Sequence, residues 1–175
     1  MTHVELYDTT LRDGAQYEGI SLSVNDKLAI TGKLDQLGIH YIEGGWPGSN
    51  PKDAEYFAKA RDMNLSQATL AAFGSTRRAG ISVDQDPNIA ALLDSMATVV
   101  TLVGKTWDMH VKKVLNTSME ENLSMIYDSI AFLKSLGRRV FFDAEHFFDG
   151  FNENRDYALQ TVRSAAEAGA ECVVL

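Results

Sequence analysis

With 175 residues, the chain is long enough to form one folded domain with a substantial core, and its 45% hydrophobic and 23% charged residues exclude a disordered chain. A formal net charge of -8, with no run of Lys and Arg longer than two, excludes a general binding surface for nucleic acid or acidic membranes. These properties indicate a small-molecule partner.

The start of the chain and its single cysteine both fit a cytoplasmic protein. No basic region precedes an apolar core at the N-terminus, and no apolar stretch approaches the roughly eighteen residues that a membrane span needs. Because Cys172 is the single cysteine of the sequence, an internal disulfide framework is excluded. Because it lies in the apolar run 172–175, we expect it to be a buried core residue and not a nucleophile.

The first predicted strand runs into a cluster of opposite charges. Val4 and Leu6 lie two residues apart, as on one face of a strand, and the Thr9–Thr10 pair favours continued extended backbone. Arg12 and Asp13 are then expected at its C-terminal end. There the carboxylate could bind a hard cation while the guanidinium faces an oxyanion on the same ligand. A surface salt bridge is the alternative that these residue types leave open.

Helices and strands alternate along the rest of the chain. Capping-box patterns at 23–26 and 118–121 predict two helices, which end at Gly38 and Gly137. Further helices are expected at 51–58, 89–93 and 157–166, and further strands at 39–43, 70–73, 98–103, 140–142 and 171–175.

This alternation predicts an α/β fold with parallel strands. Gly38, Gly137 and Gly169 each lie between a helix and an apolar strand, as in αβ turns. A doubly wound sheet and a (β/α)8 TIM barrel both fit, and we favour the barrel because no Gly-x-Gly-x-x-Gly follows the first strand. A closed barrel needs eight strands, so residues 1–175 are expected to form an incomplete barrel, truncated after about strand six, without strands seven and eight or C-terminal domains.

Chemistry in such barrels lies at the C-terminal ends of the strands. In this sequence those ends carry several polar or charged side chains, in the segments 12–13, 43–45, 73–75, 104–105 and 143–146. We therefore expect one polar site at one mouth of the barrel.

Asp8-Thr-Thr-Leu-Arg-Asp-Gly-Ala-Gln16 resembles the metal-binding motif of the 2-isopropylmalate synthase, homocitrate synthase and HMG-CoA lyase superfamily. The resemblance covers essentially the whole chain and is greatest to the citramalate synthase branch. It rests on the segments 19–21, 40–53, 72–78, 103–108 and 142–150.

This resemblance implies roles for particular residues. Arg12 would stabilise an oxyanion, Asp13 would bind the metal, and Glu145 would lie against the keto acid and acetyl group as a catalytic residue. Further substrate-binding side chains are expected at Gln16, Glu43 and Asp143, and Phe73 and Leu102 could form pocket walls.

The implied reaction is a Claisen-type condensation of acetyl-CoA with a 2-oxo acid, with pyruvate giving citramalate for branched-chain amino-acid biosynthesis. The resemblance also implies a divalent metal (Mn, Mg or Zn) and a homodimer in the parent protein. An HMG-CoA lyase-type cleavage is one alternative. A non-catalytic partial barrel that pairs its open edges is another.

One part of the superfamily pattern is missing from this sequence. The His-x-His motif that supplies its other metal ligands does not occur, so we expect weak metal binding and no activity from residues 1–175 alone. His3 and His40 precede their strands and are interpreted as structural, whereas His146, beside Glu145, could be structural or functional.

Overall fold

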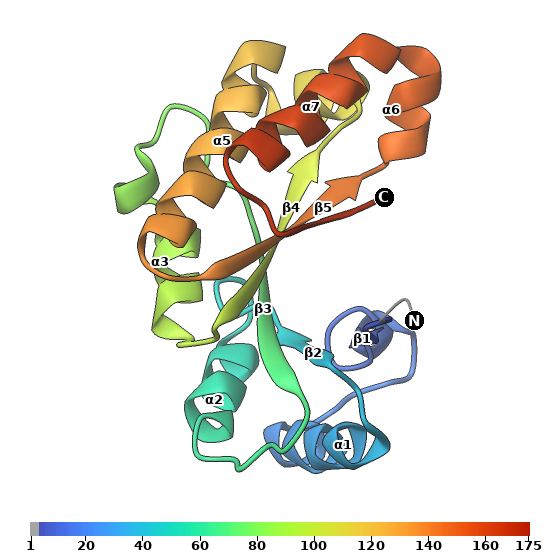
Figure 1. Cartoon of the computed structure of the whole chain (residues 1–175), viewed down its shortest axis with the longest axis vertical. Coiled ribbons are helices and arrows are strands. Elements are labelled where there is room, and N and C mark those ends of the chain that lie inside the picture. The colour runs from blue at the N-terminus through green and yellow to red at the C-terminus, as the bar shows by residue number, and fades with distance from the viewer. Residues whose placement is uncertain (1–3) are drawn as a thin grey trace.

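Six parallel strands in sequence order form the centre of the computed structural model, which describes residues 4–175 (Figure 1). The strands are β1 Tyr7–Asp8, β2 Tyr41–Gly45, β3 Thr69–Ser75, β4 Val99–Lys105, β5 Arg139–Glu145 and β6 Cys172–Val174. The larger helices are α1 Val24–Leu37, α2 Pro51–Ala60, α3 Pro87–Asp94, α5 Met119–Ser135, α6 Phe147–Glu153 and α7 Arg155–Glu167. Shorter turns of helix are η1 Gly14–Gln16, η2 Val83–Gln85, α4 Asp108–His110 and the π-helix η3 Val111–Leu115.

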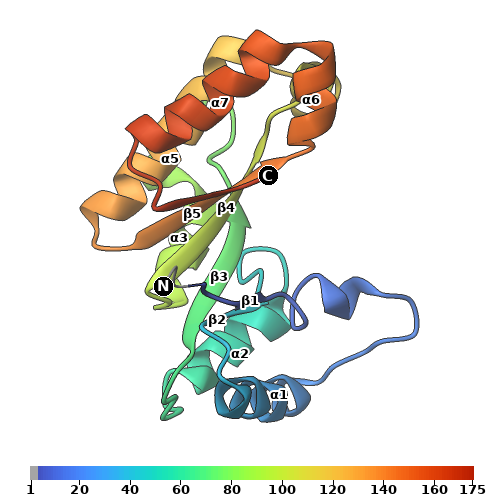
Figure 2. The same cartoon turned by 45° about the vertical axis from the view of Figure 1, so that its right-hand side comes forward.

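This arrangement confirms the predicted fold, part of a (β/α)8 barrel. The strand order never reverses, as it would in a doubly wound sheet. Helices α1 and α2 lie along the β1–β3 half of the curved sheet, and α5 and α7 lie along the β4–β6 half (Figures 1 and 2).

Alternate residues of each strand face opposite sides of the sheet. One side carries a small cluster in which Tyr41, Val99 and Phe141 pack with Tyr7. The other side belongs to the main core under the helices and includes Ile42, Ala72, Val100, Leu102 and Phe142. The small cluster therefore occupies the interior face of the barrel, below the polar strand ends.

Local signals located several element boundaries correctly. Ser23 and Asp26 form both hydrogen bonds of a capping box, and Gly38, Gly137 and Gly169 all have positive φ. The second predicted capping box is only half formed. Ser118 Oγ accepts the Glu121 N–H, but the Glu121 carboxylate bonds to Arg77 instead.

The first strand is shorter than the sequence predicts. It ends at Asp8, whose side chain accepts bonds from the backbone N–H and the hydroxyl of Thr10, both at 3.0 Å. This Asx turn bends the chain before Arg12, so the expectation of extended backbone through Thr10 was wrong.

Cys172 is exposed, against the expectation that it is buried. It pairs with Phe141 in register and so faces the barrel interior. Because β6 is the last strand of the described sheet, that side of Cys172 is covered only from the β5 side. The sequence correctly predicts an apolar strand here, but whether the Cys172 side chain is buried depends on the side chains of neighbouring strands.

Asp35, near the end of α1, ties the chain that follows α2 to that helix. Its carboxylate accepts the backbone N–H groups of Ser66, Gln67 and Ala68, at 2.8 to 3.1 Å. These bonds, that of Ser66 first, hold the pKa of Asp35 well below its usual range.

We expect this carboxylate to make stability depend on pH. Its folded-state pKa is depressed, so its stabilisation is complete above the unfolded pKa of about 3.9 and is lost as pH falls below it. In Asp35→Asn, melting temperatures measured between neutral pH and pH about 2 should decrease less steeply than in the unmodified protein. Asp62→Asn, at an exposed position nearby, is the control and should retain the full slope. Equal slopes for Asp35→Asn and the unmodified protein would contradict this role.

Candidate active site

A cavity of about 570 Å³ opens at the C-terminal ends of the strands. Most of the predicted site residues line it, from segments far apart in the sequence. Its wall consists of Arg12, Asp13, Gln16, Trp46, Phe73, Ser75, Thr76, Val103, Lys105, Leu115, Asp143 and Glu145. The structure therefore brings five predicted site residues, namely Arg12, Asp13, Gln16, Asp143 and Glu145, around one space.

Arg12 is held on three sides. Its Nε donates to Glu43 Oε1 at 2.5 Å, and its Nη1 donates to Asp13 Oδ1 at 3.1 Å. The guanidinium carbon lies 3.8 Å from the centre of the Phe73 ring, as in a cation–π contact. Arg12 is thus fixed before any ligand arrives, with part of its guanidinium facing the cavity.

Glu43 lies beneath Arg12 and does not line the cavity. Its side chain is 1% exposed, and Oε2 accepts the Tyr7 hydroxyl at 2.6 Å. Burial raises its pKa, while the bonds from Tyr7 and Arg12 oppose that rise. Burial and the neighbouring Glu43 also raise the pKa of Tyr7. Glu43 therefore supports Arg12 from below.

Asp143 and Glu145 lie two residues apart at the C-terminal end of β5, and both side chains face the interior of the barrel. Glu145 pairs with Lys105, its partner in register on β4. Asp143 is partly buried, and this burial raises its pKa, with Arg12 opposing the rise and Glu145 and Asp13 adding to it. The carboxyl group of Asp143 therefore binds its proton more tightly than an ordinary aspartate.

Asp13 and Gln16 lie at the open edge of the cavity, on the turn that contains η1. The Asp13 side chain is 64% exposed, with one oxygen bonded to Arg12. Both side chains therefore remain accessible to a ligand that enters from solvent.

Sequence reasoning missed part of the wall. Trp46 Nε1 donates to Asn88 Oδ1 at 2.8 Å, and Asn88 Nδ2 donates to the Ser75 carbonyl at 2.6 Å. The sequence does contain a signal for this part of the wall, because Trp46 directly follows the two glycines at the end of β2. Leu102 is not a pocket wall, because it faces the main core, and its neighbour Val103 lines the cavity instead.

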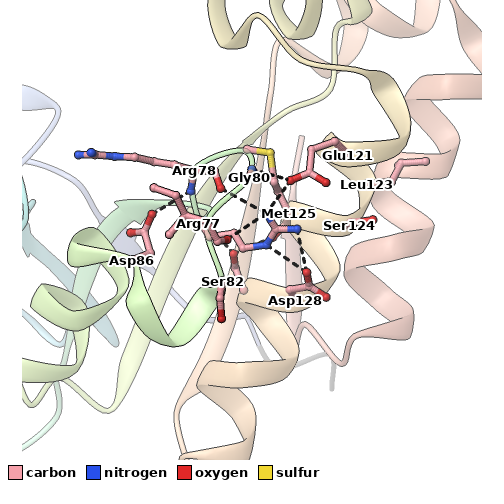
Figure 3. Close-up of polar contacts among 12 residues, drawn as sticks. Arg77, Arg78, Gly80, Ser82, Asp86, Glu121, Leu123, Ser124, Met125 and Asp128 are labelled. Atoms are coloured by element: carbon pink, nitrogen blue, oxygen red, sulfur yellow. Dashed lines mark hydrogen bonds and ion pairs between the residues drawn. The ribbon is translucent and has the colours of Figure 1, made fainter.

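The loop after β3, which carries Thr76 at the cavity wall, is anchored by Arg77 (Figure 3). The buried guanidinium pairs with Glu121 and Asp128 of α5 at 2.7 and 2.9 Å. The backbone N–H of Arg77 donates to Ser129 Oγ at 2.8 Å. These contacts fix the loop against the helix rather than create a second site.

The histidines occupy different surroundings. His40 Nδ1 accepts the Leu6 N–H at 3.0 Å, which supports its structural interpretation, and His3 lies outside the described residues. His146 does not line the cavity, although it follows Glu145 directly. Its ring meets that of His110 edge to face, with centroids 4.7 Å apart. Burial, and then the nearby His146, lower the pKa of His110.

The cavity residues do not complete a metal site. Asp13, Asp143 and Glu145 place three carboxylates around a space that holds two cations, Arg12 and Lys105. This excess of negative charge suits a cation. However, across residues 4–175 no group of three His, Cys, Asp or Glu side chains is arranged to hold a metal ion.

Comparisons with known proteins agree with the fold and the motifs. The HMGL-like family model matches residues 3–175. The chain is 55% identical, over its full length, to an (R)-citramalate synthase of Geobacter sulfurreducens, and 57% identical over 97% of its length to one of Streptomyces coelicolor. It covers 33% and 32% of these relatives, so it spans about a third of their length.

Two further matches are more distant in sequence. A 2-isopropylmalate synthase of Methanocaldococcus jannaschii is 35% identical over 97% of this chain and 30% of that protein. The crystal structure of an HMG-CoA lyase from Bacillus subtilis superposes with a TM-score of 0.76 at 18% identity, covering 97% of this chain and 56% of the lyase.

Among the described residues, no helix is long and apolar enough to cross a membrane.

Proposed function

This chain belongs to the HMGL-like family, and from that premise we propose that the intact protein condenses acetyl-CoA with pyruvate to give citramalate. The observation that supports this most is the shared cavity of Arg12, Asp143 and Glu145, in a chain more than half identical to citramalate synthases along its whole length. An HMG-CoA lyase reaction has only the fold in its favour, because the lyase structures are less than 25% identical to this chain.

The proposed reaction forms one carbon–carbon bond and breaks one thioester bond. A base removes a proton from the acetyl methyl group, and the resulting enolate carbon attacks the keto carbon of pyruvate. The carbonyl electron pair moves to oxygen, which then takes up a proton. Water hydrolyses the thioester, so that acetyl-CoA, pyruvate and water give citramalate, free CoA thiol and a proton.

In this proposal Arg12 stabilises the oxyanion that develops on the keto oxygen. The guanidinium is already fixed by Glu43 and Phe73, so it does not need to reorganise when charge develops. Glu145, held by Lys105, positions the acetyl group or accepts its proton. Asp143, with its raised pKa, is a stronger base than an ordinary aspartate, and Gln16 completes the polar wall.

We also propose that the intact protein uses a divalent metal such as Mn, Mg or Zn, and works as a cytoplasmic homodimer. The metal would supply Lewis-acid chemistry at the substrate oxygens, and Asp13 would be the ligand from this part of the protein. Because residues 4–175 contain no complete ligand set, we expect residues 1–175 alone to bind metal weakly and to be inactive.

Thiol release from acetyl-CoA, measured with different 2-oxo acids on the intact protein, tests the substrate assignment. We expect pyruvate to give the highest kcat/KM. 2-Oxobutanoate should be slower by roughly 10- to 200-fold, because an apolar pocket discriminates a single methylene only modestly. A preference for 2-oxoisovalerate over pyruvate by about tenfold or more would contradict the assignment.

A further inference from the structure

Tyr7 of β1 takes part in two different structures inside the barrel. Its ring packs in the apolar interior cluster, with ring centroids 6.1 Å from Tyr41 and 6.0 Å from Phe141. Its hydroxyl lies 2.6 Å from Glu43 Oε2 on β2 and 2.6 Å from Thr101 Oγ1 on β4. Neither Tyr7 nor Thr101 belongs to the described cavity wall. The Tyr7 hydroxyl therefore joins three strands in the layer below the cavity.

The hydrogen bonds of this layer run in one direction. An ionised carboxylate only accepts hydrogen bonds, so the Tyr7 hydroxyl donates its single proton to Glu43. The Tyr7 oxygen then accepts the proton of the buried Thr101 hydroxyl. On the other side, Arg12 Nε donates to the second oxygen of Glu43 at 2.5 Å. The chain of bonds thus runs from Thr101 through Tyr7 and Glu43, and it ends at the guanidinium that lines the cavity.

Tyr7 also acts on the charge of Glu43. Burial raises the pKa of Glu43, the bond from Tyr7 and then the Arg12 guanidinium oppose this rise, and Asp143 of β5 adds to it. Burial, and then the nearby Glu43, raise the pKa of Tyr7, so its hydroxyl keeps its proton and remains a donor. Tyr7 therefore favours the ionised form of Glu43, which is the counter-charge of Arg12.

A protonated Glu43 would hold Arg12 less well, because the Coulomb attraction between them would be lost. The Glu43 side chain is 1% exposed, so water screens this attraction little and its loss would be large. Asp13 and Asp143, both in the cavity wall, also attract the guanidinium and would then compete for it. The position of Arg12 thus depends on a carboxylate that lies outside the cavity.

We propose that Tyr7 is a positioning residue of the reaction, whose hydroxyl fixes the Glu43 carboxylate and through it directs the Arg12 guanidinium at the substrate. This inference rests on the proposed function for the reaction that Arg12 serves. It assigns to Tyr7 no contact with the substrate. Thr101 holds the Tyr7 hydroxyl in the same chain of bonds, so it contributes in the same direction and to a smaller extent.

The pH dependence of kcat in Tyr7→Phe, measured on the intact protein, tests the proposal. The variant keeps the aromatic ring and removes the hydroxyl, so the pKa of Glu43 should rise and its carboxyl should take up a proton at higher pH. At saturating pyruvate and acetyl-CoA, kcat of the unmodified protein should exceed that of the variant by about tenfold or more near pH 6, and by less than about threefold near pH 8.5. A ratio that does not change with pH would indicate a purely structural effect and would overturn the proposal.

Tyr56→Phe is the matched control. The Tyr56 hydroxyl is also buried and lies 2.7 Å from a threonine hydroxyl, that of Thr31, but it belongs to the main core between α1 and α2. This variant should keep the pH profile of the unmodified protein.

A double variant shows whether Tyr7 acts through Glu43. Glu43→Gln removes the titrating group, so adding Tyr7→Phe to it should lower kcat by less than about threefold at any pH. If Tyr7→Phe causes the same pH-dependent loss in both backgrounds, it does not act through Glu43, and the proposal is wrong.

Thr101→Val keeps the proposal testable if circular dichroism shows that Tyr7→Phe does not fold. It leaves the tyrosine in place and removes the hydroxyl that holds it. Its kcat should again fall further below that of the unmodified protein near pH 6 than near pH 8.5, by about threefold. Equal ratios at the two pH values would then overturn the proposal.

Infrared spectra recorded over a pH titration without substrates measure the charge of Glu43 directly. The band of its protonated carboxyl group is identified by its absence in Glu43→Gln. This band should persist to higher pH in Tyr7→Phe than in the unmodified protein, and an unchanged titration would overturn the proposal. The measurement needs no turnover, so its result stands even if no thiol is released from acetyl-CoA and the proposed function fails.

Discussion

Replacing Arg12 with alanine should lower kcat by about 100- to 1,000-fold, the usual effect of removing one preorganised oxyanion donor. The structure explains why the effect should be large. Glu43, Asp13 and Phe73 fix the guanidinium in place, and no other side chain of the described cavity wall can replace its planar donor set. Thiol release from acetyl-CoA with saturating pyruvate measures the change.

Two controls separate catalysis from folding in this experiment. Arg12→Lys keeps the charge but loses the planar donors, and should remain well below full activity. Melting temperature shows whether Glu43, left without Arg12 in its buried position, destabilises the protein. Full activity of a folded Arg12→Ala protein would eliminate Arg12 from the mechanism.

Replacing Lys27 with methionine should lower the free energy of unfolding by about 3–5 kcal/mol, because it leaves the buried Asp53 carboxylate without its counter-charge. The two side chains are 4% and 10% exposed. Lys27 Nζ also donates to the Gly44 carbonyl at 2.9 Å, and Asp53 accepts the Trp46 N–H at 2.9 Å. The pair therefore holds the turn that places Trp46 in the cavity wall.

Urea unfolding of Lys27→Met, with Lys59→Met as the control, measures this contribution. Lys59 pairs with Glu55 on α2 at 2.8 Å, but the two side chains are 51% and 56% exposed. Such an exposed pair one helical turn apart contributes only about 0.3–0.5 kcal/mol. Similar losses in the two variants would show that burial of the Lys27 pair has little energetic effect.

The features that could be predicted from the sequence are those that local chemistry decides. The capping box at Ser23 and the positive-φ glycines Gly38, Gly137 and Gly169 need only their neighbours in the chain. The strand ends could be predicted too, because parallel strands covered by helices leave their polar residues at one edge.

The rest depends on contacts between distant segments. Lys105 meets Glu145 because two strands pair in register, and these residues are 40 positions apart in the sequence. Whether Leu102 or Val103 faces the cavity depends on strand parity, and a shift of one residue reverses it. Glu43 faces the barrel interior like Tyr41, but it lies in the layer under Arg12 rather than in the cavity wall, because Arg12 and Tyr7 cover its carboxylate.

The most direct test of the proposed reaction is the product formed by the intact protein from acetyl-CoA and pyruvate labelled with ¹³C at its keto carbon. We expect the label to move from a carbonyl signal to the quaternary carbinol carbon of citramalate in the NMR spectrum, with one CoA thiol released per molecule formed. Thiol release with the label still in pyruvate would show simple thioester hydrolysis. That result, or cleavage of 3-hydroxy-3-methylglutaryl-CoA without any condensation, would contradict the proposed function.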